Sequence, residues 1–278
     1  MIKNNTKKDT GSLIFYYAIR LATFITFSIL LFLVGYILVK GVTHIKPSMF
    51  AWNYSTDNVS MTPAIITTLL VVFISLLISA PIGIFTGFYL VEYATRGSKL
   101  VELIRLSAET LAAIPSIVYG LFGMIFFVGV LDLGFSVLSG VLTVSIMILP
   151  LIIRSTEEAL ISVNDSLRYG SFALGSGKLR TIFKVVLPTA MPGIVSGIIL
   201  ATGRVIGETA ALLYTLGTST NMPTSLFSSG RTLSLHMYVL SSESFHVDEA
   251  YATGVILLVV VIILNQVSVW LCNKWTGV

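Results

Sequence analysis

Six long, mostly apolar stretches without a charged residue constrain the fold of this chain more than any other feature of its sequence. A helix needs about 20 mostly apolar residues to cross the hydrocarbon core of a bilayer. We therefore expect an all-α integral membrane protein with about six transmembrane helices. Their expected positions are Leu21–Val39, Asn58–Val91, Thr110–Leu131, Leu133–Ile153, Val185–Gly203 (continued through Glu208) and Ala250–Asn273.

The composition supports a lipid environment and excludes several other functions. Charged residues make up 11% of the chain, whereas soluble domains carry about 25%, so these charges could not cover a surface in water. The net charge of +4 is not gathered into a basic patch interleaved with aromatic residues, and we expect no nucleic-acid partner. The three histidines and the single Cys272 have no metal-ligand spacing, so we expect no metal site.

The basic residues predict the orientation of the helices, because Lys and Arg are concentrated in cytoplasmic segments. If the N-terminus is cytoplasmic, the outer segments hold Lys40, Lys46 and Arg231, and most other basic residues fall inside. We expect both termini in the cytoplasm and a retained first helix, since its apolar run is too long for a signal peptide. Residues 1–56 then form a tail, this helix and an outer loop, and residues 57–278 form the transmembrane domain.

One long inner loop, residues 154–188, joins the fourth and fifth expected helices. Asp165 or Ser166 can cap a short helix in this loop, and Gly175 and Gly177 allow a turn after it. A second helix is expected to follow the turn and to end at Pro188. The loop is either an amphipathic connector or a docking element for a soluble partner.

The spacing in this loop resembles that of ABC importer permeases, which carry E-A-A, three residues, Gly, nine residues and I-x-L-P. Here Tyr169-Gly170-Ser171 is followed by three residues, Gly175, nine residues and Val185-x-Leu187-Pro188. The resemblance implies the type I, MetI-like permease fold, with a cytoplasmic coupling helix that docks on a partner ATPase. The residues that it assigns to this coupling are Arg168, Tyr169, Gly170, Ser171, Gly175, Leu187 and Pro188.

The loop departs from the family at one position and contains no nucleotide site of its own. Tyr169 stands where the family has an acidic residue, so an aromatic contact could replace the ion pair, or Arg168 could supply the polar contact. The run from Gly175 to Lys178 is not a phosphate-binding P-loop, because Phe172 and Leu179 occupy required positions. We expect a permease subunit that is not an enzyme and binds no cofactor, with ATP and Mg²⁺ held by the partner ATPase.

A charged pair lies within the fifth expected helix, where charges are costly and usually face a bundle interior or a cavity. Arg204 and Glu208 are four residues apart and are expected on one helix face. They form either a structural ion pair or part of a substrate path. Arg154 is a second path residue or a residue that reaches the membrane surface, and Glu157 and Glu158 are expected to be solvated loop charges.

The segment from Gly203 to Leu213, G-R-V-I-G-E-T-A-A-L-L, resembles the R-x-x-G-E-T-A-P-L-L motif of phosphate importer permeases, nearest to the PstA-type subunit. We expect Arg204 to attract the anion through its forked donors. Glu208 would accept a hydrogen bond from the phosphate hydroxyl, which sulfate cannot offer. The expected substrate path consists of Arg204, Glu208, Arg154 and Thr209.

The resemblance also implies a set of partners in a bacterial plasma membrane. These are a homologous PstC-type permease, a dimer of PstB-type ATPases, an external PstS-type phosphate-binding protein and phosphate itself. The alternatives are an importer of another oxyanion such as sulfate or molybdate, an ion-coupled secondary transporter and a membrane anchor that transports nothing. The docking loop argues against the secondary transporter, and Arg204 inside a helix argues against the anchor.

Overall fold

Helices make up the regular structure of the described chain. The computed structural model describes residues 10–95, 97–243 and 245–276, and within these ranges it contains helices and no strand. Five helices are long and apolar enough to cross a membrane, and a bent pair adds a sixth if it counts as one span. The expected all-α membrane protein with about six transmembrane helices is therefore confirmed.

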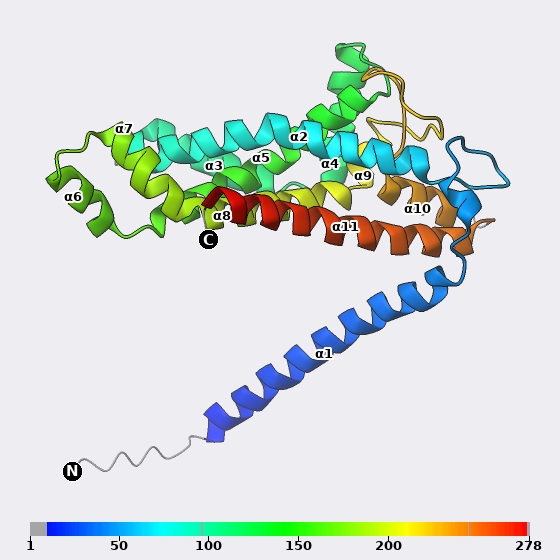
Figure 1. Ribbon diagram of the computed structural model, residues 1–278, viewed down its shortest axis with the longest axis horizontal. Helices are drawn as coiled ribbons and strands as arrows, with labels where there is room; N and C mark the ends of the chain where they lie inside the picture. The colour runs from blue at the N-terminus through cyan, green and yellow to red at the C-terminus, as the bar shows by residue number, and fades with distance from the viewer. Residues whose placement is uncertain (1–9, 96, 244, 277–278) are drawn as a thin grey trace.

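Four long helices run along the longest dimension of the molecule (Figure 1). The most buried of them has 67% of its apolar window inside the protein, which places it at the centre of the bundle. In order along the chain, the four are α2 (Thr62–Phe88), α5 (Val137–Ile161), α8 (Leu187–Ile206) and α11 (Val247–Thr276), of which α5 is the central one.

Glycines let α2 and α8 approach α5 closely. A Cβ added at Gly83 of α2 would lie 2.7 Å from the side chain of Ile152. A Cβ at Gly197 of α8 would overlap the side chain of Ser155. Since backbones approach most closely where the side chain is smallest, these glycines fix the spacing of the three-helix core.

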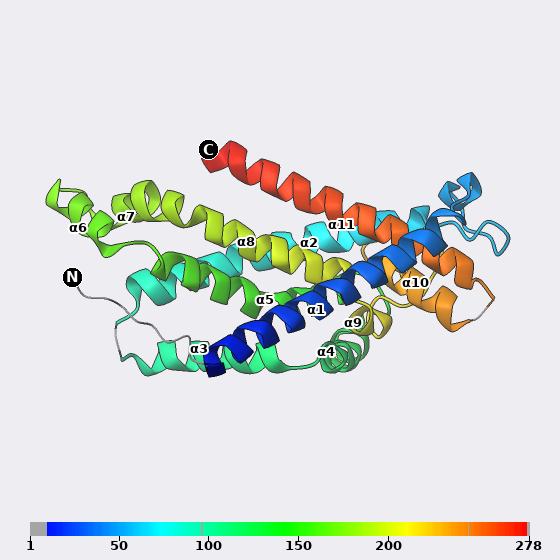
Figure 2. The same ribbon diagram turned by 90° about the horizontal axis from the view of Figure 1, so that it is seen from below.

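The third apolar stretch is not one straight helix, which corrects the expected span Thr110–Leu131. α3 (Lys99–Ala113) is followed by α4 (Ser116–Gly123) and the π-helix η3 (Met124–Val130), at 100° to α3. Pro115 causes the break, because a proline lacks a backbone donor and pushes the preceding residue into an extended conformation. In Figure 2, α3 lies along the bundle while α4 is seen nearly end-on.

The first helix, α1 (Thr10–Val42), leans away from the other helices in Figure 1 and crosses in front of them in Figure 2. None of its apolar window is buried within this chain. It meets the bundle near its C-terminal end, where the rings of Tyr36 and Tyr251 are 5.8 Å apart. Gly41 lies directly against the backbone of Tyr251, so a larger residue there would collide with α11. Over most of its length α1 therefore exposes an apolar surface.

The loop between the fourth and fifth membrane helices is shorter than expected, because α5 continues to Ile161. α6 (Asp165–Ala173) follows it, and Asn164 caps α6 by accepting a hydrogen bond from the N–H of Ser166 at 2.9 Å. The expected cap at Asp165 or Ser166 is therefore wrong. Gly175 ends the segment with φ +80°, a conformation that favours glycine.

The second helix of the loop does not end at Pro188, which corrects the expectation. α7 (Lys178–Thr181), the π-helix η4 (Ile182–Val186) and α8 follow one another without a break and form one apolar helix of 29 residues. Pro188 lies directly after η4, whose wider π-turns change the hydrogen-bond pattern beside its missing N–H. The coupling loop is thus continuous with the fifth membrane helix.

The two ends of the bundle carry different elements. α6, the beginning of α1 and the end of α11 lie toward one end, which we call the α6 end (Figure 1). The short helices at the opposite end, which we call the α10 end, are η1 (Pro47–Phe50) and α10 (Leu233–Ser242). The α6 end therefore contains the segment that resembles a coupling helix.

Candidate functional site

The fifth membrane helix ends before it reaches Glu208. α8 ends at Ile206, and Gly207 follows it. The carboxylate of Glu208, which is 8% exposed, accepts a hydrogen bond from the N–H of Ala211 at 2.9 Å. This bond supports the short helix α9 (Ala210–Leu213), whose first N–H groups have no helical partner. Glu208 is therefore held by the backbone after the helix break.

This break overturns the expected pairing of Arg204 with Glu208. The structure, which describes both residues, places them on different segments and shows no ion pair between them. Arg204 instead lines a cavity of about 470 Å³ that Glu208 and Thr209 do not line. Thr209 lies at the start of α9, half-buried and without a capping bond from its side chain.

Three arginines and three glutamates line this cavity, which we call the arginine cavity. Its opposite charges balance, and its walls come from α3, α5 and α8 together with the π-helix η2 (Tyr89–Tyr93) that extends α2. The structure thus brings Arg204 together with Arg154, as the substrate-path hypothesis requires. The charged lining residues are Arg105, Glu109, Arg154, Glu157, Glu158 and Arg204.

Two of the arginines have carboxylate partners. Nη2 of Arg105 lies 2.6 Å from Oε1 of Glu157, and Nε of Arg154 lies 3.0 Å from Oε1 of Glu158. Because α5 extends to Ile161, both glutamates lie on a helix, and Glu157 is only 15% exposed. The expectation that they are solvated loop charges is wrong for Glu157, whereas Glu158 is 65% exposed.

Arg204 differs from the other two arginines of the cavity. Within the described part of the chain, no carboxylate pairs with its guanidinium. A half-buried guanidinium without a counterion attracts anions, and its planar fork suits the oxygens of a tetrahedral oxyanion. Arg204 is therefore the residue of the cavity that is most available to a bound anion.

Arg105 and Glu109 were missed in the sequence. Both lie on α3, in a segment that reads as an ordinary charged inner loop. Their spacing of four residues, which places both on one face of a helix, is the signal that could have found them. That face became visible only when the break at Pro115 showed α3 to be a separate helix alongside α5.

The predicted coupling helix α6 is almost fully exposed, with no buried residue. Tyr169 is 69% exposed and Leu174, the residue directly after α6, is 88% exposed, so this surface offers an aromatic and an apolar side chain to a partner. Gly170 has open space around its Cα, and Ser171 contacts Thr181 of α7 through their hydroxyls at 2.8 Å. Leu187 and Pro188 lie on α8 and are not part of the exposed surface of α6.

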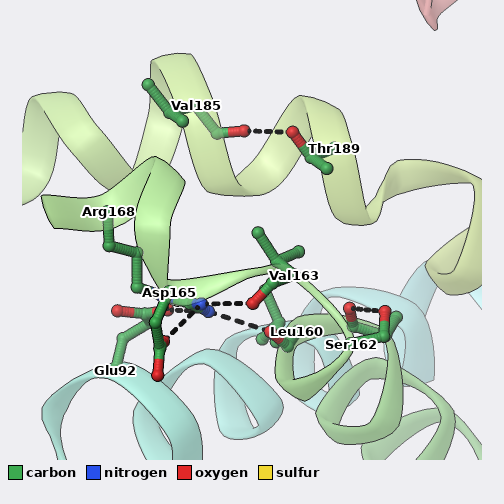
Figure 3. Close-up of polar contacts among 9 residues, drawn as sticks. Glu92, Leu160, Ser162, Val163, Asp165, Arg168, Val185 and Thr189 are labelled. Carbon is green, nitrogen blue, oxygen red and sulfur yellow. Dashed lines mark hydrogen bonds and ion pairs between the residues drawn. The ribbon is translucent and has the colours of Figure 1, made fainter. Parts of the chain in front are cut away.

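Arg168 points away from this exposed surface. Its guanidinium donates to Glu92, Asp165 and the backbone carbonyls of Leu160 and Val163 (Figure 3). These five hydrogen bonds match the five N–H donors of an arginine. All five donors of Arg168 are therefore engaged within the chain, and Tyr169 is the exposed neighbour that can contact a partner.

A second buried arginine lies at the α10 end. Arg231, expected in an outer loop, is 4% exposed and lies over the ring of Tyr54 at 4.9 Å. Burial lowers the pKa of Arg231, and burial together with the charge of Arg231 lowers the pKa of the neighbouring His236 to about 3. His236 is therefore neutral at physiological pH, packed edge-on against Tyr54.

The fold agrees with the family that the sequence matches. Residues 79–273 match the family of binding-protein-dependent transport system inner membrane components. The chain belongs to this family, the membrane subunits of ABC importers. The crystal structure of a bacterial alginate ABC transporter bound to its periplasmic protein has a TM-score of 0.69, with 18% identity, over 98% of this chain and 99% of that chain. The type I, MetI-like fold is thereby confirmed.

Relatives of higher identity include an ABC transporter permease and PstA homologues of the phosphate transport system, which support a PstA-type permease. The probable ABC transporter permease YqgI of Bacillus subtilis is 33% identical over 88% of this chain and 89% of its own length. The PstA homolog of the phosphate transport system of Mycoplasma pneumoniae is 31% identical over 89% of this chain. This chain spans 39% of the length of that Mycoplasma protein.

Proposed function

We propose that this chain is the transmembrane permease subunit of an ATP-driven inorganic phosphate importer in a bacterial plasma membrane. The observation that carries the proposal is the arginine cavity, in which Arg204 has no counterion while Arg105 and Arg154 are paired. The family gives the importer class, and the relatives named as phosphate transport permeases favour phosphate as the substrate.

The cavity provides both kinds of contact that phosphate needs. Arg204 donates to the anionic oxygens, and Arg154 can exchange its bond to the exposed Glu158 for a bond to the anion. Phosphate at neutral pH keeps a hydroxyl, and Glu109 or Glu158 can accept its hydrogen bond. Sulfate offers no such donor and would face an uncompensated carboxylate. Glu208 is bound to Ala211, so on this proposal the selectivity assigned to it passes to the carboxylates of the cavity.

The remaining parts of the importer lie in partner subunits. A PstC-type permease completes the path, a PstB-type ATPase dimer binds ATP and Mg²⁺, and an external PstS-type protein delivers phosphate. α6 docks on the ATPase through Tyr169 and Leu174, and Thr209 stays a candidate path residue beyond the helix break. Both termini are cytoplasmic, which agrees with the start of α1 and the end of α11 lying toward the α6 end.

Uptake by the reconstituted complex tests the proposal. The four kinds of subunit are placed in vesicles, and labelled phosphate is followed with and without ATP, in the presence of excess sulfate. We expect ATP-dependent uptake that sulfate does not reduce and that Arg204→Gln abolishes. The control Arg20→Gln changes an exposed arginine on α1 and should leave uptake unchanged.

Other results separate the alternatives. ATP-dependent uptake of sulfate or molybdate instead of phosphate would assign the chain to another oxyanion importer of the same architecture. Phosphate uptake without ATP would contradict the coupling to an ATPase. Normal phosphate uptake by the Arg204→Gln complex would remove the cavity from the path.

A further inference from the structure

The exposed helix α6 is attached to the rest of the chain by two sets of polar contacts. None of its residues is buried, so it gains little from apolar packing. One attachment is the hydroxyl contact between Ser171 and Thr181, which connects α6 to the helix that becomes α8. The other is Arg168, which connects α6 to two further membrane helices.

Arg168 joins three elements with one side chain (Figure 3). Its Nε and Nη2 donate to the same oxygen of Glu92, at 3.0 and 2.9 Å, and Glu92 belongs to η2 at the end of α2. Its Nη1 and Nη2 also donate to the carbonyls of Val163 and Leu160, at 2.7 and 2.8 Å. These carbonyls lie at the C-terminal end of α5, where helical partners are missing. α6 is therefore fixed to α2 and α5 together.

Burial makes the pair between Arg168 and Glu92 a strong contact. Their side chains are 13% and 10% exposed, whereas Asp165, the other carboxylate on Arg168, is 69% exposed. An exposed pair contributes little, but removing one partner of a buried pair leaves a charge without compensation. A lysine has a single ammonium group and cannot reach all four acceptor groups that the guanidinium reaches.

The elements that Arg168 joins also form the arginine cavity. Leu90 of η2 lines the cavity, and α5 supplies Arg154 and Glu157. η2 is a π-helix, and so is η4 at the base of α8. π-segments inside helices often mark functional sites, because their wider turns let the helix change its hydrogen-bond pattern locally. A displacement of α6 therefore reaches the cavity walls through Arg168 on one side and through Ser171 on the other.

We propose that Arg168 and Glu92 are positioning residues that make the coupling helix move as one body with α2 and α5. In this role they transmit the displacement of α6 by the ATPase to the arginine cavity. The inference rests on the proposed function, since it assumes that a partner ATPase moves α6. It adds a residue, Glu92, that lies 76 residues from Arg168 in the chain and belongs to no coupling motif.

The test compares transport with ATP hydrolysis in the complete complex. Arg168→Gln, Glu92→Gln and the double variant are reconstituted with all partner subunits, and phosphate imported per ATP hydrolysed is measured. Each single variant should lower this ratio by about five-fold or more, the size of a typical coupling between sites. The double variant should lower it no further than the single variants, because both changes remove the same contact.

Thermal unfolding of the same variants separates transmission from folding. The single variants leave a buried charge unpaired and should lose stability. The double variant removes both charges and should recover most of that stability while its transport ratio stays low. Asp165→Asn is the matched control, because it removes the exposed branch of the Arg168 contacts and should leave the ratio unchanged.

Three outcomes would overturn the proposal. The first is a normal transport ratio in either single variant. The second is a double variant whose loss is the product of the single losses, which would mean that the residues act independently. The third is failure of the ATPase to copurify with the variants, which would assign the pair to docking. If the wild-type complex imports a different anion, the proposed function fails, while the ratio measured with that anion still tests the pair.

Discussion

The carboxylate of Glu208 accepts a hydrogen bond from the backbone N–H of Ala211 at 2.9 Å, directly after the last turn of α8. The backbone carbonyl of Glu208 in turn accepts a hydrogen bond from the hydroxyl of Ser234 in α10, at 2.7 Å. Glu208 thus fixes the helix break from both sides. The same break separates Glu208 from Arg204 and leaves that arginine facing the cavity.

Two substitutions at Glu208 should distinguish the contribution of its hydrogen bond to stability from the contribution of its charge. Glu208→Ala removes the acceptor for Ala211 and should lower the free energy of unfolding by about 1 kcal/mol, the usual effect of losing a helix-capping group. Glu208→Gln keeps an acceptor oxygen and should unfold close to the wild-type temperature. Thermal unfolding in detergent measures both, and an equal loss in the two variants would show that the negative charge matters and the bond does not.

The balanced charges of the arginine cavity predict opposite effects on anion affinity. Glu157→Gln releases Arg105 from its 2.6 Å ion pair and should lower the KM for the transported anion. Arg105→Gln leaves Glu157 unpaired and should raise the KM for the transported anion. A change of roughly 1 kcal/mol in the binding free energy of the anion, in either direction, corresponds to about five-fold in KM. Initial uptake rates at varied phosphate concentration measure this, with Glu102→Gln on α3, outside the cavity lining, as the control. A shift of KM in the same direction for both variants would contradict the electrostatic argument.

The buried His236 predicts a loss of stability in acid. Its pKa is about 3 in the folded protein, and a histidine in an unfolded chain titrates near 6.5. As the pH falls below about 6.5, protons bind the unfolded chain first, so this residue lowers stability by at most about 1.4 kcal/mol per pH unit until the pH reaches its folded pKa. Unfolding temperatures measured from neutral pH down to about pH 5 should fall less steeply in His236→Phe. An unchanged slope in His236→Phe would refute the assignment.

Two glycines of α8 should respond differently to the same substitution. A Cβ at Gly197 would overlap Ser155 of α5, so Gly197→Ala forces the helices apart and should cost about 1–3 kcal/mol. Gly203 has no atom within 4 Å of an added Cβ, so Gly203→Ala should be neutral or stabilising. Thermal unfolding of the two variants checks this, and similar unfolding temperatures would mean that α8 does not pack on α5 as described.

The membrane helices were predictable because a bilayer imposes a length and a composition on each of them. Gly175 was also predictable, since its positive φ reflects a local preference of glycine. The helix end at Ile206 was not, because a single glycine such as Gly207 within an apolar helical pattern can either be tolerated or end the helix. What ends α8 is the capture of Glu208 by Ala211 and Ser234, and the latter is a contact from a distant segment.

The cavity was only half predictable, for a related reason. Arg204 and Arg154 are conspicuous because they lie in or beside apolar stretches. Arg105 lies in a segment with several charges and Glu92 lies at the end of an apolar helix, where charges are ordinary. Their partners are 52 and 76 residues away. A periodic pattern reports which face of a helix is apolar, but it contains no information about which distant side chain completes an ion pair.

Arg168 uses all five of its N–H donors in hydrogen bonds within the chain. This limits how the permease can be re-engineered. A coupling loop grafted here from a related permease would bring its own contacts for an ATPase. It would lack the hydrogen bonds that anchor Arg168 to η2 and to the end of α5. Such a chimera needs the graft to carry residues 89–93 and 160–173 together. The unit that can be exchanged between permeases is therefore these two segments of chain, which the guanidinium of Arg168 joins.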